Sequence, residues 1–351
     1  MRGAGSTPYR LGRGCTRLWL VPFEAIFGQA AAVGTLEQML RAGRVHHALR
    51  FEGIEGVGKE MAAMAFAQAL VCTAGNPTGC GGCSACERAV TMGEGVPSVP
   101  LHPDVIFVER GLYPPEVLGR TRPEAQELSV DQIRTVVLER AAFPPHEGKA
   151  RIYIVRRAEE LSISAANALL KTLEEPGRNT YFVLLVSRPA RLLSTIRSRT
   201  LRVRFAPLGD DVLRKILASH GISSEEVERV IPLCAGSATA ALELADAHAS
   251  EQREAFVRQA LEALQSKDSA AALAFADSQG RDKAVVRLHL GALAVHFARQ
   301  AREAVLRQEL SARQFALRHE LVLQAISDVE RNASPVLAIE NMMLRLRAET
   351  G

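Results

Sequence analysis

Residues 53–60, GIEGVGKE, have the composition of a loop that binds phosphate groups. The segment follows a short apolar pattern typical of a strand and precedes a helical pattern over 61–70. In such loops glycines let backbone N–H groups turn inward around phosphate oxygens, a lysine neutralises the terminal phosphates, and the positive end of the following helix adds attraction. The residues that we expect to bind phosphate are Gly53, Gly56, Gly58 and Lys59.

The residues that would hold a magnesium ion beside this loop are replaced. Hydrolysis of ATP requires a Ser or Thr after the lysine as a metal ligand, and Glu60 occupies that position. It also requires acidic residues at the end of a neighbouring strand, where the chain has Arg156 and Arg157. Glu159 and Glu160 follow, out of register with the strand end. We therefore expect that ATP or ADP can still bind but is not hydrolysed; the alternative is an ATPase with an unusual loop.

Four cysteines are clustered at the spacing C-x7-C-x2-C-x2-C within residues 72–86. Glycines between them loosen the backbone, so that four thiolates can converge on a tetrahedral zinc ion. A redox role for one C-x-x-C pair is the alternative, but such a pair does not need two further cysteines. We expect a structural zinc knuckle whose ligands are Cys72, Cys80, Cys83 and Cys86.

Charge and hydropathy limit the classes of function. The net charge of +4 is mildly basic and falls short of the strongly basic surface typical of proteins that bind nucleic acid unaided. No apolar run approaches the roughly 20 residues of a membrane span. Pro22 and Glu24 interrupt the apolar stretch that follows the N-terminal arginines, so we expect residues 1–21 to be a flexible extension rather than an export signal. Together with the clustered cysteines, this predicts a cytoplasmic protein.

The elements that must position these residues alternate between strand and helix as far as Phe205, which predicts an α/β domain with a mainly parallel sheet. The five expected strands are 48–51, 105–108, 151–155, 181–186 and 201–205. After Pro207 the strand patterns stop and Ala and Leu recur at helical spacing. The expected domains are 22–206, a helical unit at 207–247 and a longer helical array at 248–351.

Two apolar stripes run through that last array at helical spacing. Both are more typical of a domain core than of a ligand site, although such an all-helical domain can also serve in oligomerisation. The first stripe is Val286, Leu290, Leu293, Phe297 and Ala301, and the second is Phe315, Val322, Ile326 and Val329.

Three further motifs accompany the phosphate loop and the cysteine cluster, and they make the combination more specific than either feature alone. They are His102-Pro-Asp, the block from Asn167 to Pro176 (NALLKTLEEP), and Thr195-Ile-Arg-Ser-Arg. The block predicts a helix with Ser164 as its N-cap and Pro176 as its stop.

In this order, from Phe23 to Ala247, the phosphate loop, the cysteines and these motifs resemble bacterial clamp-loader subunits of DNA polymerase III. The resemblance implies an AAA+ (P-loop NTPase-like) α/β domain, a small helical lid, and an all-α C-terminal collar domain that joins five subunits.

Within that family, the motor subunits keep the Ser or Thr of the loop, an Asp-Glu pair at the strand end, and an arginine in the lid. The corresponding positions here are Glu60, Arg156 with Arg157, and Thr239. These departures resemble the stationary members, which do not hydrolyse ATP but supply an arginine finger to a neighbour. By that match Arg199 is the finger, although Thr200 replaces the usual cysteine after it. An arginine supplied in trans is worth about 10³ to 10⁵ in rate.

The resemblance implies partners as well: gamma/tau and delta subunits in a hetero-pentamer, the sliding clamp, and primed DNA. The expected function is to help load the clamp in DNA replication, while DNA-directed DNA polymerase (nucleotidyltransferase) activity belongs to other subunits. Two rivals remain open. A motor subunit would turn over ATP in isolation, and a zinc-dependent nucleic-acid-binding protein would bind DNA unaided and with a strong salt dependence.

Overall fold

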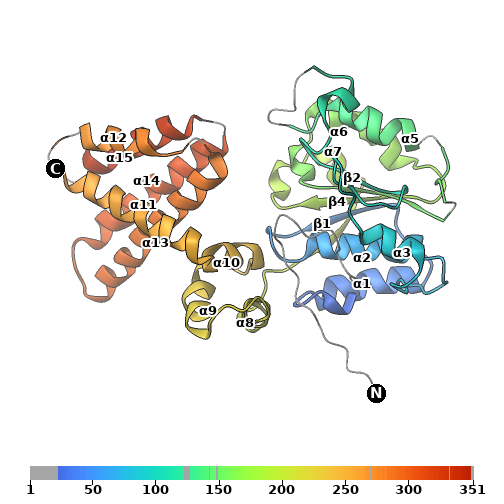
Figure 1. The fold of residues 1–351 in the computed structure, drawn as a ribbon, viewed down its shortest axis with the longest axis horizontal. Coiled ribbons are helices and arrows are strands. Elements are labelled where there is room, and N and C mark those ends of the chain that lie inside the picture. The colour runs from blue at the N-terminus through green and yellow to red at the C-terminus, as the bar shows by residue number, and fades with distance from the viewer. Residues whose placement is uncertain are drawn as a thin grey trace. The chain divides into compact units, whose positions relative to one another are not determined.

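The computed structural model describes residues 23–121, 127–141, 143–147, 149–266, 268, 270–280, 282–331 and 333–348. These residues divide into two compact units, one ending at Ala241 and one beginning at Leu242 (Figure 1). The expected extension at residues 1–21 lies outside the described residues. Among the residues described, no helix is both long enough and apolar enough to cross a membrane.

The first unit is built on a five-stranded sheet, and all four strand pairs are parallel. Its spatial order is β2-β3-β4-β1-β5. Every residue of β2 and β3 is buried, as expected where helices cover both faces of a parallel sheet. The strands are β1 (Ala48–Glu52), β2 (Val105–Val108), β3 (Arg151–Val155), β4 (Thr180–Val186) and β5 (Leu201–Arg204). All five expected strands are confirmed, and with them the predicted α/β fold with a parallel sheet.

Helices lie on both sides of this sheet (Figure 1). The helices on one side are α1 (Ala30–Arg41), α2 (Lys59–Val71) and α3 (Ser84–Val90). Those on the other side are α6 (Ile163–Glu174), α7 (Ser194–Arg197) and a continuous helix made of α4 (Val130–Gln132), a π-helical segment (Ile133–Leu138) and α5 (Glu139–Ala141).

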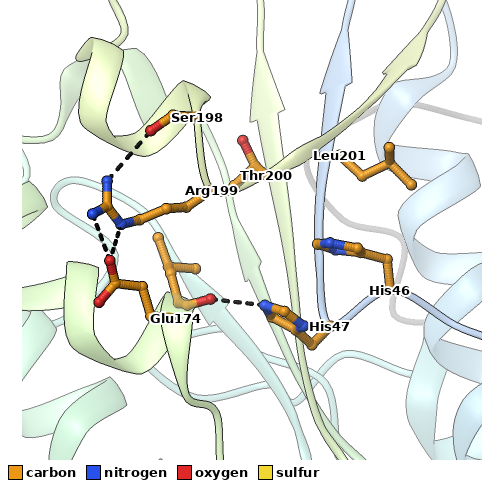
Figure 2. Close-up of a pocket in the computed structure, with 8 residues that line it drawn as sticks. His46, His47, Glu174, Ser198, Arg199, Thr200 and Leu201 are labelled. Carbon is orange, nitrogen blue, oxygen red and sulfur yellow. Dashed lines mark hydrogen bonds and ion pairs between the residues drawn. The ribbon is translucent and has the colours of Figure 1, made fainter.

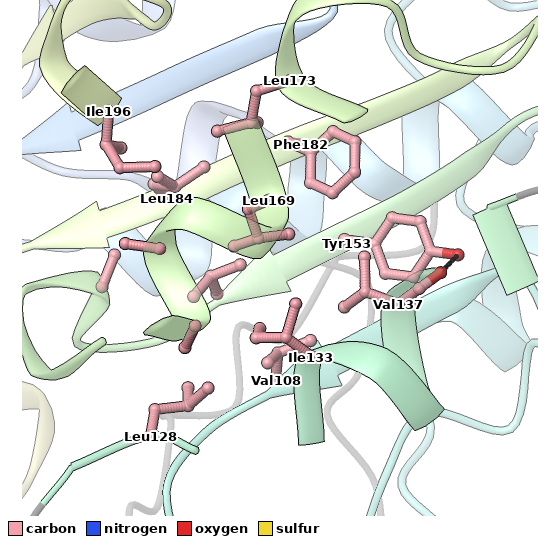
Figure 3. Close-up of a cluster of buried hydrophobic side chains, with 14 of the residues drawn as sticks. Val108, Leu128, Ile133, Val137, Tyr153, Leu169, Leu173, Phe182, Leu184 and Ile196 are labelled. Carbon is pink, nitrogen blue, oxygen red and sulfur yellow. Dashed lines mark hydrogen bonds between the residues drawn. The ribbon is translucent and has the colours of Figure 1, made fainter. Parts of the chain in front are cut away.

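The core between α6 and the sheet is dense and largely apolar (Figure 3). Tyr153 of β3 stacks on Phe182 of β4, with ring centroids 5.0 Å apart, and its hydroxyl donates to the Val137 carbonyl at 3.2 Å. Burial raises the pKa of Tyr153 to about 12. Leu169 and Leu173 of α6 face the same cluster, so one side of α6 is fixed against the sheet.

The start of α6 corrects one prediction. The N-cap is Ser162, whose hydroxyl accepts from the Ala165 amide at 3.1 Å, and not Ser164. Ser162 has the extended backbone that a cap requires, whereas Ser164 already lies inside the first helical turn. The predicted stop holds, because α6 ends at Glu174, two residues before Pro176.

The chain after β5 is helical, as predicted. It continues with α8 (Asp210–Ser219), α9 (Ser224–Val230), a short 3-10 turn (Ile231–Leu233) and α10 (Ala238–Ala245). The second unit contains α11 (Ala247–Gln265), α12 (Ala270–Ser278), α13 (Lys283–Leu306), α14 (Ala312–Glu330) and α15 (Pro335–Ala348).

The first apolar stripe lies in α13, where Val286, Leu290, Leu293 and Phe297 are buried in the core of this second unit. The predicted domain boundaries at 206/207 and 247/248 stay predictions.

Candidate functional site

The phosphate loop joins β1 to α2 at the edge of the sheet where the parallel strands end, which is where open α/β sheets bind ligands. Gly56 and Gly58 have φ of 78° and 93°, a left-handed conformation that favours glycine. A Cβ at Gly53 would lie 2.5 Å from the Phe205 carbonyl oxygen. The glycines predicted from the sequence are therefore those that the loop conformation requires.

Lys59, the first residue of α2, lies folded against its own loop. Its ammonium donates to the carbonyls of Gly53 and Ile54, both at 2.6 Å, and to the Ser187 hydroxyl at 3.1 Å. The residue is only 7% exposed. Burial lowers the pKa of Lys59 to about 8, although Glu159 and Glu55 oppose the shift.

The two substituted metal-site positions contact each other. The Arg156 guanidinium, directly after β3, forms a close ion pair with the Glu60 carboxylate in the first turn of α2. It also pairs with Glu109 at 3.0 Å and lies 3.9 Å from the centroid of the Phe107 ring. From the sequence, Glu60 and Arg156 are two separate replacements of expected magnesium ligands. In the structure the two side chains form one ion pair. A guanidinium therefore lies beside the position at which a magnesium ligand was expected.

The neighbouring acidic residues are engaged elsewhere. Glu159 accepts the backbone amides of Ser187 and Arg188 at 3.0 and 3.1 Å. Glu160 pairs with Arg110 at 2.9 Å and with Arg157 at 3.6 Å. Neither carboxylate takes the place of the missing acidic pair, in agreement with their register in the sequence.

The beginning of α10 packs on the phosphate loop. The Ala238 amide donates to the Gly56 carbonyl at 3.0 Å, and a Cβ at Gly56 would lie 2.4 Å from the Ser237 hydroxyl. Thr239, the residue expected in place of a lid arginine, contributes a hydroxyl 2.8 Å from that same point. Sequence analysis missed Ser237, whose signal was its place as a potential cap before a helical pattern.

The four predicted cysteines converge, and their sulfurs all lie within 4.8 Å of one another. Tetrahedral zinc with Zn–S bonds near 2.3 Å places its sulfurs about 3.8 Å apart, and the Sγ atoms of Cys80 and Cys86 are separated by 3.9 Å. This donor set fits zinc. Cys72 follows directly after the last residue of α2, and Gln68 of that helix donates to the Cys86 carbonyl at 3.0 Å. The knuckle is therefore attached to the helix that begins at the phosphate loop.

The thiols differ in their surroundings. For Cys83, burial acts to raise the pKa, but hydrogen bonds with Thr73 and Cys86 outweigh it and lower the pKa to about 5. Burial raises the pKa of Cys86 well above that of an ordinary thiol. Zinc coordination requires deprotonated sulfur, so metal binding must displace the proton that burial favours on Cys86.

A buried polar cluster next to the knuckle contains the His102-Pro-Asp motif. Asp104 is fully buried; it accepts the amides of His146 and Glu147 at 2.7 and 2.8 Å and pairs with Arg151 at 3.1 Å. His102 lies 3.3 Å from the Glu147 carboxylate. These contacts fix the segment before β3 to the segment before β2, so the motif has a structural role here.

Arg199 lies at the other edge of the sheet, where the strands begin (Figure 2). Its guanidinium contacts the Glu174 carboxylate at 2.5 Å and donates to the Thr195 carbonyl at 3.0 Å and the Ser198 hydroxyl at 3.3 Å. β1, with its five residues, separates this edge from the phosphate loop by roughly 16 Å. Arg199 therefore lies too far from the phosphate loop of its own chain to contact a nucleotide bound there.

An open hollow of about 400 Å³ lies beside Arg199. In Figure 2 the guanidinium points toward Glu174 and Ser198, and away from His46 and His47. The residues lining the hollow are His46, His47, Leu173, Glu174, Ser198, Arg199, Thr200 and Leu201.

Thr200, directly after Arg199, is buried beside this hollow. Its hydroxyl accepts from Arg50 at 2.9 Å and donates to the Ile196 carbonyl at 2.9 Å. The residue after Arg199 is therefore fixed by hydrogen bonds to two neighbouring segments.

Comparison with known proteins gives a consistent set of relatives. The model of the family described as "DNA polymerase III, delta subunit" matches residues 28–209. The DNA polymerase III subunit delta' of Haemophilus influenzae is 32% identical over 242 residues, which is 69% of this chain and 65% of that protein. The DNA polymerase III subunit gamma/tau of Mycobacterium tuberculosis is 32% identical over 199 residues, 56% of this chain and 30% of that protein.

The chain therefore spans less than two thirds of the length of either of these curated relatives. Among solved structures, a DNA polymerase III gamma subunit-related protein from Thermotoga maritima covers 90% of this chain and 99% of its own, at 17% identity and a TM-score of 0.48.

Proposed function

The chain belongs to the DNA polymerase III, delta subunit family, and within it we propose that the chain is a non-hydrolysing stator of the delta-prime type in a clamp loader. In this role it completes the assembly and supports motor subunits without turning over ATP itself. Its proposed partners are gamma/tau and delta subunits in a hetero-pentamer, the sliding clamp and primed DNA. The proposed location is the cytoplasm, at the site of replication.

The observation that carries this proposal is the ion pair between Glu60 and Arg156. A magnesium ion held between the phosphate loop and the end of β3 needs oxygen ligands, and a carboxylate already paired with a guanidinium is a poor substitute. The positive charge of Arg156 also repels a divalent cation at that place. Without the metal, a bound triphosphate lacks the ion that neutralises charge as phosphoryl transfer proceeds.

The position of Arg199 supports a role in trans. The residue lies at the opposite edge of the sheet from its own phosphate loop, on a surface open to a neighbour. An arginine there can stabilise the charge that develops on the nucleotide of an adjacent motor subunit.

The proposed cofactors follow from two donor sets. The four converging thiolates fit a structural zinc ion, with every position filled by protein. ATP or ADP binding at Gly53, Gly56, Gly58 and Lys59 is proposed to be independent of magnesium, because the carboxylate that follows the lysine, Glu60, is paired with Arg156.

A motor subunit of the gamma/tau type is the second candidate. It is favoured by the intact glycines and Lys59, and by the 32% identity to a gamma/tau subunit. The test is ATP turnover and ATP binding by the isolated chain with Mg²⁺ and with EDTA, beside the variant Glu60→Thr/Arg156→Asp. We expect no turnover by the wild type, and Mg²⁺-dependent ATP binding in the variant alone. Turnover by the wild type would establish the motor.

A further inference from the structure

Each of the three guanidinium nitrogens of Arg199 contacts an oxygen of its own chain. Its Nε and one terminal nitrogen both contact a single oxygen of Glu174, each at 2.5 Å. The other terminal nitrogen donates to Thr195 and Ser198. Glu174 is the last residue of α6, and its side chain is about half exposed. Figure 2 shows the guanidinium turned toward this carboxylate.

An arginine that acts on a neighbour's nucleotide must give its N–H groups to phosphate oxygens. Arginine forms its strongest contacts as a two-point fork, and Nε and Nη2, the two nitrogens of the side-on fork, are held here by Glu174. A carboxylate and a phosphate cannot both occupy the same two donors. The two anions therefore compete for one guanidinium.

Two features leave the arginine free to exchange. Its side chain is about one-third exposed, so release from Glu174 does not leave a buried charge unpaired. The open hollow beside Arg199, which His46, His47 and Glu174 all line, offers space for a neighbour's group to approach the guanidinium.

We propose that Glu174 is a positioning residue that holds Arg199 in a withdrawn position and competes with the neighbouring subunit's nucleotide for it. This inference rests on the proposed trans role of Arg199. Because ion pairs at this exposure are weak, the competition lowers the efficiency of the finger by only about 1.4- to 5-fold. Glu174 therefore reduces the contribution of Arg199 to the neighbour's ATP hydrolysis without abolishing it.

The test uses the reconstituted clamp loader with clamp and primed DNA, and it compares kcat/KM for ATP in Glu174→Gln and wild-type assemblies. Glu175→Gln, the same change one residue along, is the matched control. We expect Glu174→Gln to raise kcat/KM by about 1.4- to 5-fold, with the control unchanged. The melting temperature of the isolated Glu174→Gln chain should fall by no more than about 4 °C, because the variant loses one weak ion pair. Raising NaCl should shrink the difference, because salt screens the wild-type ion pair.

Repeating the comparison in an Arg199→Ala background separates this proposal from the one on which it rests. If Arg199→Ala lowers turnover and Glu174→Gln has no effect in that background, both proposals stand. An unchanged or reduced kcat/KM in Glu174→Gln, or the same rise without Arg199, overturns the competition while leaving the finger intact. An Arg199→Ala assembly as active as wild type overturns the finger itself.

Discussion

Removing the charge of Arg156 is the sharpest probe of the altered metal site. The guanidinium makes three contacts that the variant Arg156→Gln loses: the ion pairs with Glu60 and Glu109 and the stacking on Phe107. Each partly exposed pair contributes about 0.2–1 kcal/mol. The cation–π contact adds about 0.5–1 kcal/mol. The expected loss in the free energy of unfolding is therefore about 1–3 kcal/mol.

The variant Glu60→Gln removes only one of these contacts, so it should cost about 0.2–1 kcal/mol. The double variant Glu60→Gln/Arg156→Gln loses the ion pair between these residues only once. The coupling energy of the double-mutant cycle should therefore equal the free energy of that ion pair. Glu109→Gln serves as the matched control, because its pair with Arg156 is separate from the position of the magnesium ligand.

Urea denaturation and thermal unfolding at low and high NaCl measure the stability of all five proteins, wild type and control included. The melting temperature of Arg156→Gln should fall by about 2–4 °C for each kcal/mol lost. The coupling between Glu60 and Arg156 should shrink at high salt. If the coupling energy at low salt is below about 0.2 kcal/mol, Glu60 and Arg156 do not stabilise each other and the explanation of the lost metal site fails.

Three further outcomes are expected. Removing zinc with a chelator, or the variant Cys86→Ala, should unfold residues 72–86, since structural zinc contributes on the order of 10 kcal/mol; zinc release and circular dichroism measure this, and an unchanged spectrum speaks against a structural metal. Asp104→Ala leaves the buried Arg151 charge without its partner and should cost about 3–5 kcal/mol in urea denaturation; a loss below about 1 kcal/mol would disprove this role. Burial lowers the pKa of Lys59 from 10.5 to about 8 in the folded chain, so the unfolded chain binds more protons between these values. The stability of wild type relative to Lys59→Met should therefore rise from pH 8 to pH 10.5, and a flat difference would contradict the shift.

Much of the fold was predictable because its signals are local. The five strands are short apolar runs, and the glycines of the phosphate loop predict a turn from their residue type alone. The helix cap was misassigned because Ser162 and Ser164 are both suitable by residue type, and only the backbone conformation decides between them. Boundaries set by packing between helices have no comparable local signal.

The candidate site was predictable as a set of residues but not as a set of contacts. The cysteine spacing was enough to predict convergence, because those side chains are close in sequence. The pairing of Glu60 with Arg156 joins residues 96 positions apart, and the contact of Arg199 with Glu174 spans 25. Such pairs depend on the order of the strands in the sheet, and no single segment of the sequence determines that order.

The most direct test of the central claim is ATP hydrolysis by the reconstituted loader with clamp and primed DNA, comparing wild type with Arg199→Ala and recording the isolated chain beside them. We predict no turnover by the isolated chain and a large loss of turnover in the Arg199→Ala assembly. Turnover by the isolated chain, or full activity of the Arg199→Ala assembly, would contradict this claim.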